Sequence, residues 1–548
     1  MESLFNLYIG AAGTETENEN DLGPYFRVIS FEGREKISQM YSLKVVVEVT
    51  EFGELKELIN RLLKERVFLE VNYGTAYRTF PGVVRKVSII GRFQNSLHLE
   101  LTIVPRIWFL KEIIRSEIFM NMTIPEIITQ VLSKDTVIYG DISIDVSGIN
   151  PENYDKKEYV TRYNESTLDF ISRLMEEAGI YCYFKGVARD DTGGAMVKDS
   201  SVECLLFSDR KSVEKKLLPE IFRRGEGGKD DLYGLKSLSF DFSQVHKSVS
   251  VHSFDMDTSR TKKIMPKAES LVASSDIFEG VNVATVTRYA SGLTSDNVSK
   301  VSDLNAEIAA INAETVTGTG RHPEVRAGSI VSISTDYEDV KDFLLTEVVH
   351  RGRQSGSSFT YTDNPGRQAE LNFYECDITG IPAETQYRNP VTVSKPKFYG
   401  FLPAIIEGQD GGSNAPFMDE LGRYKVKLCF DIDEKTLGHS SIWLKLMTPY
   451  GGHDPAFGMH FPLLKGTQVL IGFIGGDIDE PFIAGAIQDG GGSVVNNANV
   501  NLNVIRSATG NVLILGDGTS PGEEFIFMKN TNGYTTLGHV PDDLINKF

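Results

Sequence analysis

The sequence predicts a mainly β protein with a minor helical part, on three observations. Residues 1–110 alternate apolar and polar side chains in runs such as YSLKVVVEV (41–49), RVFLEVNYG (66–74) and NSLHLELTIVP (95–105). Alternation with a period of two is typical of half-buried strands. Fifty glycines and 31 phenylalanines beside only two tryptophans indicate many short strands joined by tight turns. Two helices stand out after residues 1–110.

Composition limits the function classes. At 548 residues, 41% hydrophobic and 24% charged, the chain has the composition of a folded protein with about three or four domains. The net charge is −19 and no cluster of Lys and Arg stands apart from acids, so nucleic acid is not expected as a partner. The four cysteines form no C-x-x-C pair and are expected to be small core residues in a reducing compartment. The start, MESLFNLYIG, does not have the pattern of a signal peptide, and no run of about 18 apolar residues occurs, so neither Sec export nor a membrane span is expected.

The first helix is predicted at TIPEIITQVLSK (123–134). Thr123 and Glu126 have the spacing of a capping box, and Pro125 lies in the first turn, where its missing N–H is tolerated. Its expected apolar face is formed by Ile124, Ile127, Ile128 and Val131.

The second helix lies in RYNESTLDFISRLMEEAGIYCYF (162–184), with Ser166 as its cap and Gly179 as its end. The residues at helical spacing are Leu168, Ile171, Leu174, Met175 and Ala178, and IYCYF reads as a following strand. Arg173 lies four positions after Asp169 and four before Glu177. Because it adjoins the apolar stripe, we expect it to reach a buried carboxylate or a subunit contact rather than solvent.

Further along, surface loops are expected at 190–232 around a strand at 202–207, strands at 235–243, 246–255 and 329–337, and a short helix at 303–316. Residues 390–396 mark a boundary. Five strand candidates follow in about 90 residues and suit a small closed barrel of the OB type; they lie at 397–408, 422–433, 441–452, 466–477 and 480–487.

The last stretch, 491–548, contains the strands VLIL and FIFM, which are apolar on both faces. About 58 residues of this kind are too few to bury both faces within one chain. The stretch is therefore expected to associate with copies of itself.

No catalytic signature is present: the patterns H-E-x-x-H, G-x-S-x-G and G-x-x-x-x-G-K-[ST] are absent. His453 and His460 flank DPAFGM and are interpreted as loop histidines. Tyr163, Phe170, Tyr181, Tyr183 and Phe184 could form a ligand cage, but their spacing favours core packing.

Acidic clusters offer two alternatives. Asp477, Asp479 and Glu480 could hold a hard cation, or they could form a β-turn with Gly476 at a positive φ and the acids on the solvent side. The absence of further acids at EF-hand spacing favours the turn. Asp431, Asp433 and Glu434 are interpreted as a solvated strand end. No catalytic residue, cofactor or metal ion is expected.

Several segments together resemble VgrG-type spike proteins of contractile injection systems, and they occur in that family's order. They are YVTRYNESTLDFISRLMEEAGIYCYF (159–184), GTGRHPEVRAGSIVSI (318–333), DELGRYKVKLCFD (419–431), WLKLMTPYGG (443–452) and HFPLLKGTQVLIGFIGGDIDEPFIAGAI (460–487). The resemblance covers the chain nearly end to end.

The resemblance implies four parts: a first hub β-barrel module (1–115), a helical corner with loops and a second hub β-barrel module (116–390), an OB-fold domain (391–490), and a triple-stranded β-helix needle formed by a trimer (491–548). Val512, Ile514, Phe525 and Phe527 are the expected needle residues, with Ile514 and Phe527 on the shared axis. Leu168, Ile171, Arg173 and Leu174 are the expected structural residues of the hub corner.

The implied function is structural: a homotrimeric hub and puncturing spike that caps the tail tube, bridges to the baseplate and pierces a target envelope. Implied partners are the inner tube protein, baseplate proteins, a PAAR-like tip protein and effector cargo. We expect assembly in the cytoplasm without a signal peptide, and then release or delivery at the particle tip. The brief stretch after residue 490 favours a bare spike. Two alternatives are a tail-associated cell-wall hydrolase and a trimeric glycan-binding adhesin.

Overall fold

The computed structural model describes residues 4–9, 26–50, 53–73, 76–93, 96–136, 142–185, 203–211, 234–254, 267–272, 284–291, 295–333, 340–354, 372–409, 414–431, 438–452, 457–488, 490–518, 520–542 and 545. The chain divides into two compact units. The first contains Met1–Phe398 together with Gly475–Glu480, and the second contains Tyr399–Ile474 and Pro481–Phe548. The chain therefore leaves the first unit after Phe398 and returns to it for one six-residue loop.

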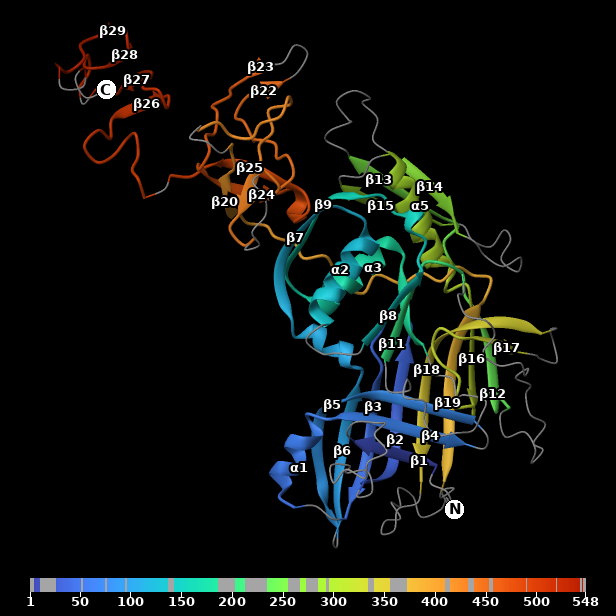
Figure 1. Ribbon diagram of the computed structural model, residues 1–548. Helices are drawn as coiled ribbons and strands as arrows, with labels where there is room; N and C mark the ends of the chain where they lie inside the picture. The colour runs from blue at the N-terminus through green and yellow to red at the C-terminus, as the bar shows by residue number, and fades with distance from the viewer. Residues whose placement is uncertain are drawn as a thin grey trace. The chain divides into compact units, whose positions relative to one another are not determined.

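The first unit is built on a large antiparallel sheet, which has 11 strands in the described part of the chain (Figure 1). Its strand order is β1-β4-β5-β6-β3-β2-β18-β19-β16-β12, with β17 paired to β18. The bounds are β1 Phe5–Ile9, β2 Phe26–Lys36, β3 Ser42–Val49, β4 Arg66–Tyr73, β5 Ala76–Phe93, β6 Ser96–Val104, β12 Ser237–Phe242, β16 Glu314–Gly320, β17 Ile330–Ile333, β18 Lys341–Arg353 and β19 Phe373–Pro382. Helix α1 (Leu55–Leu62) links β3 to β4.

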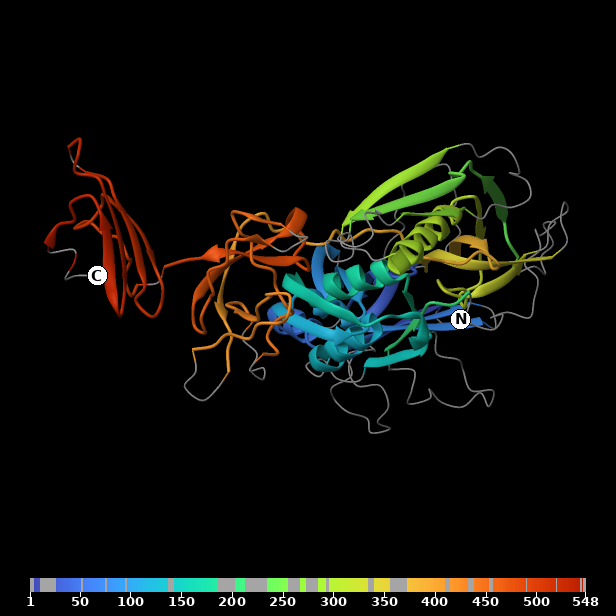
Figure 2. The same cartoon turned by 90° about the horizontal axis from the view of Figure 1, so that it is seen from above.

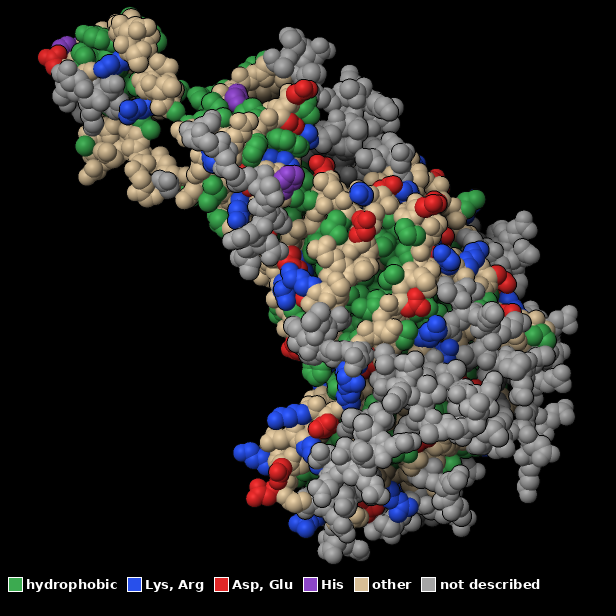
Figure 3. All heavy atoms as spheres, in the orientation of Figure 1, with side chains coloured by type: hydrophobic (Ala, Val, Ile, Leu, Met, Phe, Trp, Pro, Cys, Tyr) green, Lys and Arg blue, Asp and Glu red, His purple; other side chains and the backbone are tan. Residues whose placement is uncertain are grey.

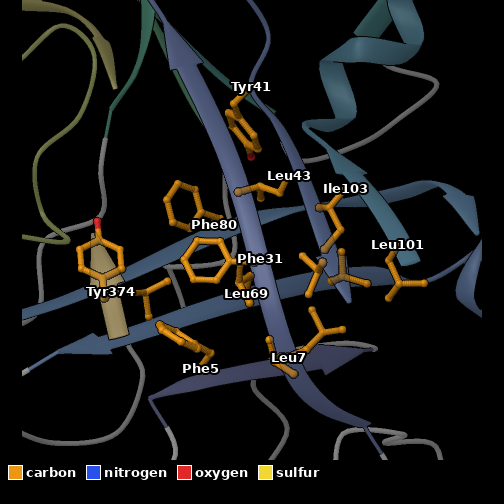
Figure 4. Close-up of a cluster of buried hydrophobic side chains, with 14 of the residues drawn as sticks. Phe5, Leu7, Phe31, Tyr41, Leu43, Leu69, Phe80, Leu101, Ile103 and Tyr374 are labelled. Atoms are coloured by element: carbon orange, nitrogen blue, oxygen red, sulfur yellow. The ribbon is translucent and has the colours of Figure 1, made fainter. Parts of the chain in front are cut away.

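The predicted alternation produces this sheet. In β3, Leu43, Val45, Val47 and Val49 are fully buried. Because successive side chains of a strand point to opposite faces, these four residues line one face and form part of the main core. Figure 4 shows this core, in which Phe5, Phe31, Phe80 and Tyr374 come together from β1, β2, β5 and β19.

The two parts of the chain that were expected to form separate modules join in this sheet. β2 pairs with β18 from Glu347↔Lys36 to Arg353↔Ser30, so strands on either side of the predicted boundary at 115 share one ladder. Four polar side chains meet in the core beside this join: Glu35, Arg78, His350 and Tyr374. Arg78 is hydrogen-bonded to Glu35, and His350 Nδ1 lies 2.6 Å from the Tyr374 hydroxyl.

A second layer contains the helical corner. Its elements are η2 (Arg106–Lys111), β7 (Ile114–Met122), α2 (Ile124–Thr136), β8 (Ile142–Gly148), η3 (Pro151–Asn153), β9 (Lys157–Ser166), α3 (Thr167–Ala178), β10 (Tyr181–Lys185) and β11 (Glu203–Ser208). The capping box of α2 is present, because Thr123 N donates to Glu126 Oε2 (2.7 Å) and Glu126 N donates to Thr123 Oγ1 (3.3 Å). The predicted helix face is buried, with Ile127 and Ile128 fully so.

A small sheet of β14 (Lys267–Leu271), β13 (Ser248–Phe254) and β15 (Thr285–Ser291) carries α5 (Ser295–Ala310) on one face (Figure 2). Val251, Val298 and Ala306 pack between them. The helix predicted at 303–316 is present as α5, but both of its predicted ends are wrong: it begins at Ser295 and ends at Ala310, and Glu314 already begins β16. The β-branched residues of Glu314–Gly320 (ETVTGTG) favour a strand, and Val316 is fully buried in the main core.

The second unit contains a small sheet in the order β21-β20-β24-β25 and a separate pair β22-β23. The bounds are β20 Leu402–Ile406, β21 Val426–Leu428, β22 Gly451–Gly452, β23 Phe457–Gly458, β24 Gln468–Phe473 and β25 Pro481–Ala486, with η5 (Ile474–Gly476) after β24. Each of the five predicted OB strand regions thus contains a strand, although every strand is shorter than the region predicted for it.

The C-terminal stretch forms an antiparallel meander of β26 (Leu502–Arg506), β27 (Val512–Gly516), β28 (Phe525–Asn530) and β29 (Gly533–Leu537), in which β27 and β28 contain the predicted strands VLIL and FIFM. Its four strands lie side by side in Figure 2.

Candidate functional site

Helix α3 has the two ends that the sequence predicts. The Ser166 hydroxyl accepts a hydrogen bond from Asp169 N at 3.0 Å, which satisfies a free N–H of the first turn. Gly179 ends the helix in the left-handed region, at φ 70°. β10 then leaves the helix, so the predicted helix-to-strand corner is present.

The apolar stripe of α3 packs inside the first unit. Phe170, Ile171, Leu174 and Met175 are buried in one cluster with α2, and Leu168 is half-buried at its edge. Phe119 of β7 stacks on Phe170, with ring centroids 5.6 Å apart. These contacts place Ile171 and Leu174 in a core position.

Arg173 lies on the buried face of α3 and is 3% exposed. It binds the Glu165 carboxylate through two donors, Nε to Oε1 at 2.9 Å and Nη2 to Oε2 at 2.8 Å, and it donates to the Thr161 carbonyl at 3.1 Å. Burial would lower the pKa of Arg173, but the hydrogen bonds and charge of Glu165 raise it above its usual value. Arg173 thus reaches a buried carboxylate as expected, although the partner lies on β9 and is neither Asp169 nor Glu177.

A second arginine, Arg162, is fully buried beside the start of α3. Its Nη1 lies 3.4 Å from Glu117 of β7 and 3.5 Å from Asp135 of α2, and its Nη2 donates to Thr167 Oγ1 at 2.7 Å. Burial lowers the pKa of Arg162 despite the charges of Glu117 and Asp135, and buried charges are retained only with such partners. The cluster joins β7, α2, β9 and α3.

Glu176 links α3 to the segment 389–393. Its carboxylate accepts hydrogen bonds from Thr392 N (2.9 Å), Val393 N (3.0 Å) and Asn389 Nδ2 (3.2 Å). Glu176 is 3% exposed, whereas the neighbouring Glu177 is exposed. Local sequence patterns carry no signal for this role, because the partners lie more than 200 positions away.

The loop Gly475–Glu480 lies against the same corner, within the first unit. It contains the predicted turn: Gly476 has φ 77°, Asp479 N donates to Asp477 Oδ1 (3.0 Å) and Glu480 N donates to the Asp477 carbonyl (2.9 Å). The prediction that its acids face solvent is wrong. Lys395 lies between two of them, with Nζ 2.5 Å from Asp477 Oδ1 and 2.6 Å from Asp479 Oδ2.

Two further contacts fix this loop. Thr161 N of β9 donates to Asp479 Oδ1 at 2.6 Å, and Phe398 N donates to the Gly476 carbonyl at 2.9 Å. Burial would lower the pKa of Lys395, but the charges of Asp479 and Asp477 raise it. The loop is therefore held by two ion pairs from Lys395 and by hydrogen bonds from backbone N–H groups.

The C-terminal sheet separates its apolar residues into two faces. Val512, Ile514, Phe525 and Phe527 are buried in a cluster with Val540 of the same chain. Ile514 and Phe527, which were expected on the shared axis, therefore already have apolar contacts within one chain. On the opposite face, register places Ile505, Leu513 and Met528 in one row and Leu515, Ile526 and Leu537 in the next. Four of these are strongly exposed: Ile505, Leu515, Met528 and Leu537.

Other candidate residues have simpler surroundings. His460 is exposed and stacks on Tyr424, while His453, Asp433 and Glu434 lie outside the described residues. Asp431 is 2% exposed, so its interpretation as solvated was wrong: its N–H closes a turn onto the Leu428 carbonyl, and this turn directs the side chain inward. Cys182 and Cys376 are core residues and Cys204 is partly buried, but Cys429 is exposed.

Of the described residues, no group of three or more His, Cys, Asp or Glu side chains is arranged to hold a metal ion. Within the same ranges, no helix combines the length and the apolar character needed to cross a bilayer. On the face seen in Figure 3, Lys and Arg side chains are interspersed with Asp and Glu side chains.

Comparison with known families agrees with this architecture. The family of the phage tail baseplate hub (GPD) matches residues 34–356, more than half of the chain, and the type VI secretion system/phage-baseplate injector OB domain matches residues 416–487. The chain belongs to the phage tail baseplate hub family.

Among curated proteins, the chain is similar to the type VI secretion system spike protein VgrG5 of Pseudomonas aeruginosa, with 24% identity over 474 residues, covering 84% of this chain and 56% of that protein. It is also 24% identical over 457 residues to the actin cross-linking toxin VgrG1 of Vibrio cholerae, covering 82% of this chain and 37% of the toxin. The chain spans about half the length or less of these relatives. The resemblance to VgrG-type spike proteins is confirmed.

Two solved structures share the fold. One is the E. coli c3393 protein, described as a type VI secretion component similar to the T4 bacteriophage tail proteins gp27 and gp5, with a TM-score of 0.56, 20% identity, and coverage of 88% of this chain and 99% of that chain. The other is a chain of a Francisella PdpA-VgrG complex, with a TM-score of 0.60, 12% identity, and coverage of 98% and 80%.

Proposed function

We propose that this chain is the hub and puncturing spike at the tip of a contractile injection system, and that it acts as a homotrimer. The exposed apolar face of the C-terminal sheet carries this proposal. Leu515 and Leu537 lie in one row of that face, and Ile505 and Met528 in the other; they are 44%, 64%, 49% and 49% exposed.

Such a face favours association. Burial of apolar surface contributes about 25 cal/mol per Å². A second copy of the chain is the partner we propose, because the face belongs to a sheet too small to cover both of its apolar sides. Three copies with closed symmetry would cover all of these faces and leave no sheet edge free.

A second surface supports the same arrangement. The segment around β22 and β23 exposes Met447, Tyr450, Phe457, Met459 and Phe461, and Tyr450 contacts Phe457 with ring centroids 5.4 Å apart. Aromatic residues and Met are enriched at protein interfaces. We propose that neighbouring copies also cover this hairpin.

The mechanism is mechanical. Rigidity comes from strands whose apolar faces are shared among three chains, so that a pushing force does not separate them. The hub connects to the inner tube protein and to baseplate proteins, and a PAAR-like protein and effector cargo are the expected partners at the tip. Two hub modules in each of three chains give six similar surfaces, which matches a six-fold tube.

An aspartate on the exposed face tests this function. Leu515→Asp places a charge where the proposed subunits meet and should convert a trimer of the full chain into monomers, because a buried unpaired carboxylate costs several kcal/mol. Ala508→Asp, in the exposed turn between β26 and β27, is the matched control and should leave the trimer intact. Equal sedimentation of both variants as trimers would contradict the proposal.

The main alternative is enzymatic. Residues with catalytic spacing are not recognisable in the sequence, and we propose a structural protein without enzymatic activity. A peptidoglycan-release assay on the purified chain should give no turnover. Turnover that is lost on substitution of a single carboxylate would favour a wall hydrolase instead. The adhesin alternative rests on loops at 190–232, which lie largely outside the described residues.

A further inference from the structure

The chain passes between its two units at three places, after Phe398, before Gly475 and after Glu480. Two segments lie on the first-unit side of these crossings. They are residues 389–398, called here the exit segment, and residues 475–480, called the return loop. Both contact the same small region of the first unit, formed by β9 and α3.

The exit segment is attached through α3. Glu176 accepts the N–H groups of Thr392 and Val393 and the side-chain amide of Asn389. A carboxylate that accepts several hydrogen bonds in a buried position fixes its donors strongly. Further along, the Phe398 ring lies 5.7 Å from the Tyr163 ring of β9.

The return loop is attached through β9. Asp479 accepts the Thr161 N–H at 2.6 Å, and Thr161 also accepts a hydrogen bond from Arg173 of α3 through its carbonyl. The loop thus docks on a strand whose position is set by the Arg173–Glu165 pair.

Lys395 connects the two attachments. It belongs to the exit segment, and its Nζ lies 2.5 Å from Asp477 and 2.6 Å from Asp479 of the return loop. The Lys395 side chain is 28% exposed and Asp479 15%, so solvent screens this pair only in part. The adjacent Lys397 is exposed, although its backbone pairs with Asp477.

We propose that β9 and α3 form a clamp that holds the exit segment and the return loop together through Lys395, so that force on the C-terminal part of the chain enters the first unit at this clamp. The inference rests on the proposed spike function, because only a protein that is pushed or pulled along its length needs such an anchor. All three covalent links between the two units lie at the ends of these two segments.

Hydrogen–deuterium exchange on the full chain tests the clamp, with Lys395→Met as the main variant and Lys397→Met as the matched control. Lys395→Met should accelerate exchange in 475–480 at least tenfold and leave strands β3 and β6 as protected as in the parent. Lys397→Met should match the parent, and Lys395→Arg, which can serve two carboxylates, should restore most of the protection. If Lys395→Met exchanges like Lys397→Met, the clamp is wrong.

A second pair of variants tests the exit segment separately. Glu176→Ala should accelerate exchange at Thr392 and Val393, and Glu177→Ala, its exposed neighbour, should not. Unchanged exchange in Glu176→Ala would also overturn the clamp. The mass of each variant, measured by light scattering, separates the two proposals: a parent that is not a trimer contradicts the spike function, whereas a normal trimer with unaltered exchange contradicts only the clamp.

Discussion

At the scale of single residues, buried charges beside the join of β2 and β18 make the hub sensitive to acid. Burial alone would raise the pKa of Glu35, but the charge of Arg78 and the nearby His350, whose Nε2 lies 3.9 Å from Glu35 Oε2, lower it to about 2. Burial lowers the pKa of His350, although Glu35 opposes this. Both groups therefore bind protons more weakly in the folded than in the unfolded chain, and folding stability rises with pH in the windows where they titrate.

We predict that the free energy of unfolding of the hub falls as pH drops below about 6.5, first through His350, and falls further between about 4.5 and 2 through Glu35. The Glu35 contribution is on the order of 3 kcal/mol. Urea denaturation at several pH values measures this change in the free energy of unfolding. Glu35→Gln should be less stable at neutral pH, because Arg78 loses its partner, and should lose the acid dependence below 4.5; an unchanged acid dependence would contradict this account.

Arg173 gives a second prediction at this scale. Arg173→Ala removes the partner of the buried Glu165 and should lower the free energy of unfolding by about 3 to 5 kcal/mol. Glu177→Ala removes an exposed ion pair with Lys157, 3.0 Å apart, and a longer-range attraction to Lys395 and Arg173, and should change the free energy of unfolding by less than about 1 kcal/mol. Thermal denaturation of the two variants side by side makes the comparison, and equal small effects would show that α3 is a solvated strut.

The sequence located Arg173 at the edge of the stripe but did not reveal Glu165. Helical spacing suggests only partners on the same helix, whereas Glu165 approaches Arg173 because β9 turns directly into α3 at Ser166. Glu176 was not singled out in the sequence. Its partners at 389–393 are set by tertiary structure, which local periodicity does not encode.

At the scale of elements, α3 contributes a large share of the apolar core of the helical corner. Leu174 is 1% exposed in a cluster with α2. Leu174→Ala should therefore cost about 2 to 5 kcal/mol through lost burial and a residual cavity. Leu168→Ala, at the half-buried edge, should cost less, and denaturation midpoints of the two variants check the order. A larger loss for Leu168→Ala would mean that the packing of α3 is described incorrectly.

The C-terminal sheet allows a further prediction about its two faces. Ile514→Asp places a carboxylate in the cluster of Val512, Phe525 and Phe527, so it should unfold this sheet even in a monomer. Leu515→Asp, one residue away on the open face, should retain the strands and lose only assembly. Exchange protection of β27 and β28 distinguishes the outcomes, and a protected sheet in Ile514→Asp would contradict the assignment of faces.

The capped ends of α2 and α3 were predicted best, because the capping residues Thr123, Ser166 and Gly179 act on neighbours in the sequence. The face that each C-terminal strand buries was predicted less well. VLIL and FIFM are apolar on both sides, so alternation alone does not tell which side is covered. In the structure, Val540, which follows the last strand, packs on one side of the sheet, and this contact determines which face is buried.

At the scale of the whole molecule, the sequence motifs in their order were sufficient to predict the family, since several separate segments matched together. They did not predict that β2 and β18 unite the two hub halves in one sheet. Pairing between residues about 300 positions apart depends on the complete fold, and no local pattern reports it.

The central claim is that three copies of this chain form one hub and spike. Light scattering of the purified full chain, measured over a hundredfold range of concentration, tests it most directly. A trimer predicts a constant mass of about 180 kDa, three times the 60.8 kDa of one chain. A constant mass near 61 kDa across the same range would contradict the trimer and, with it, the covered apolar faces on which the proposed function rests.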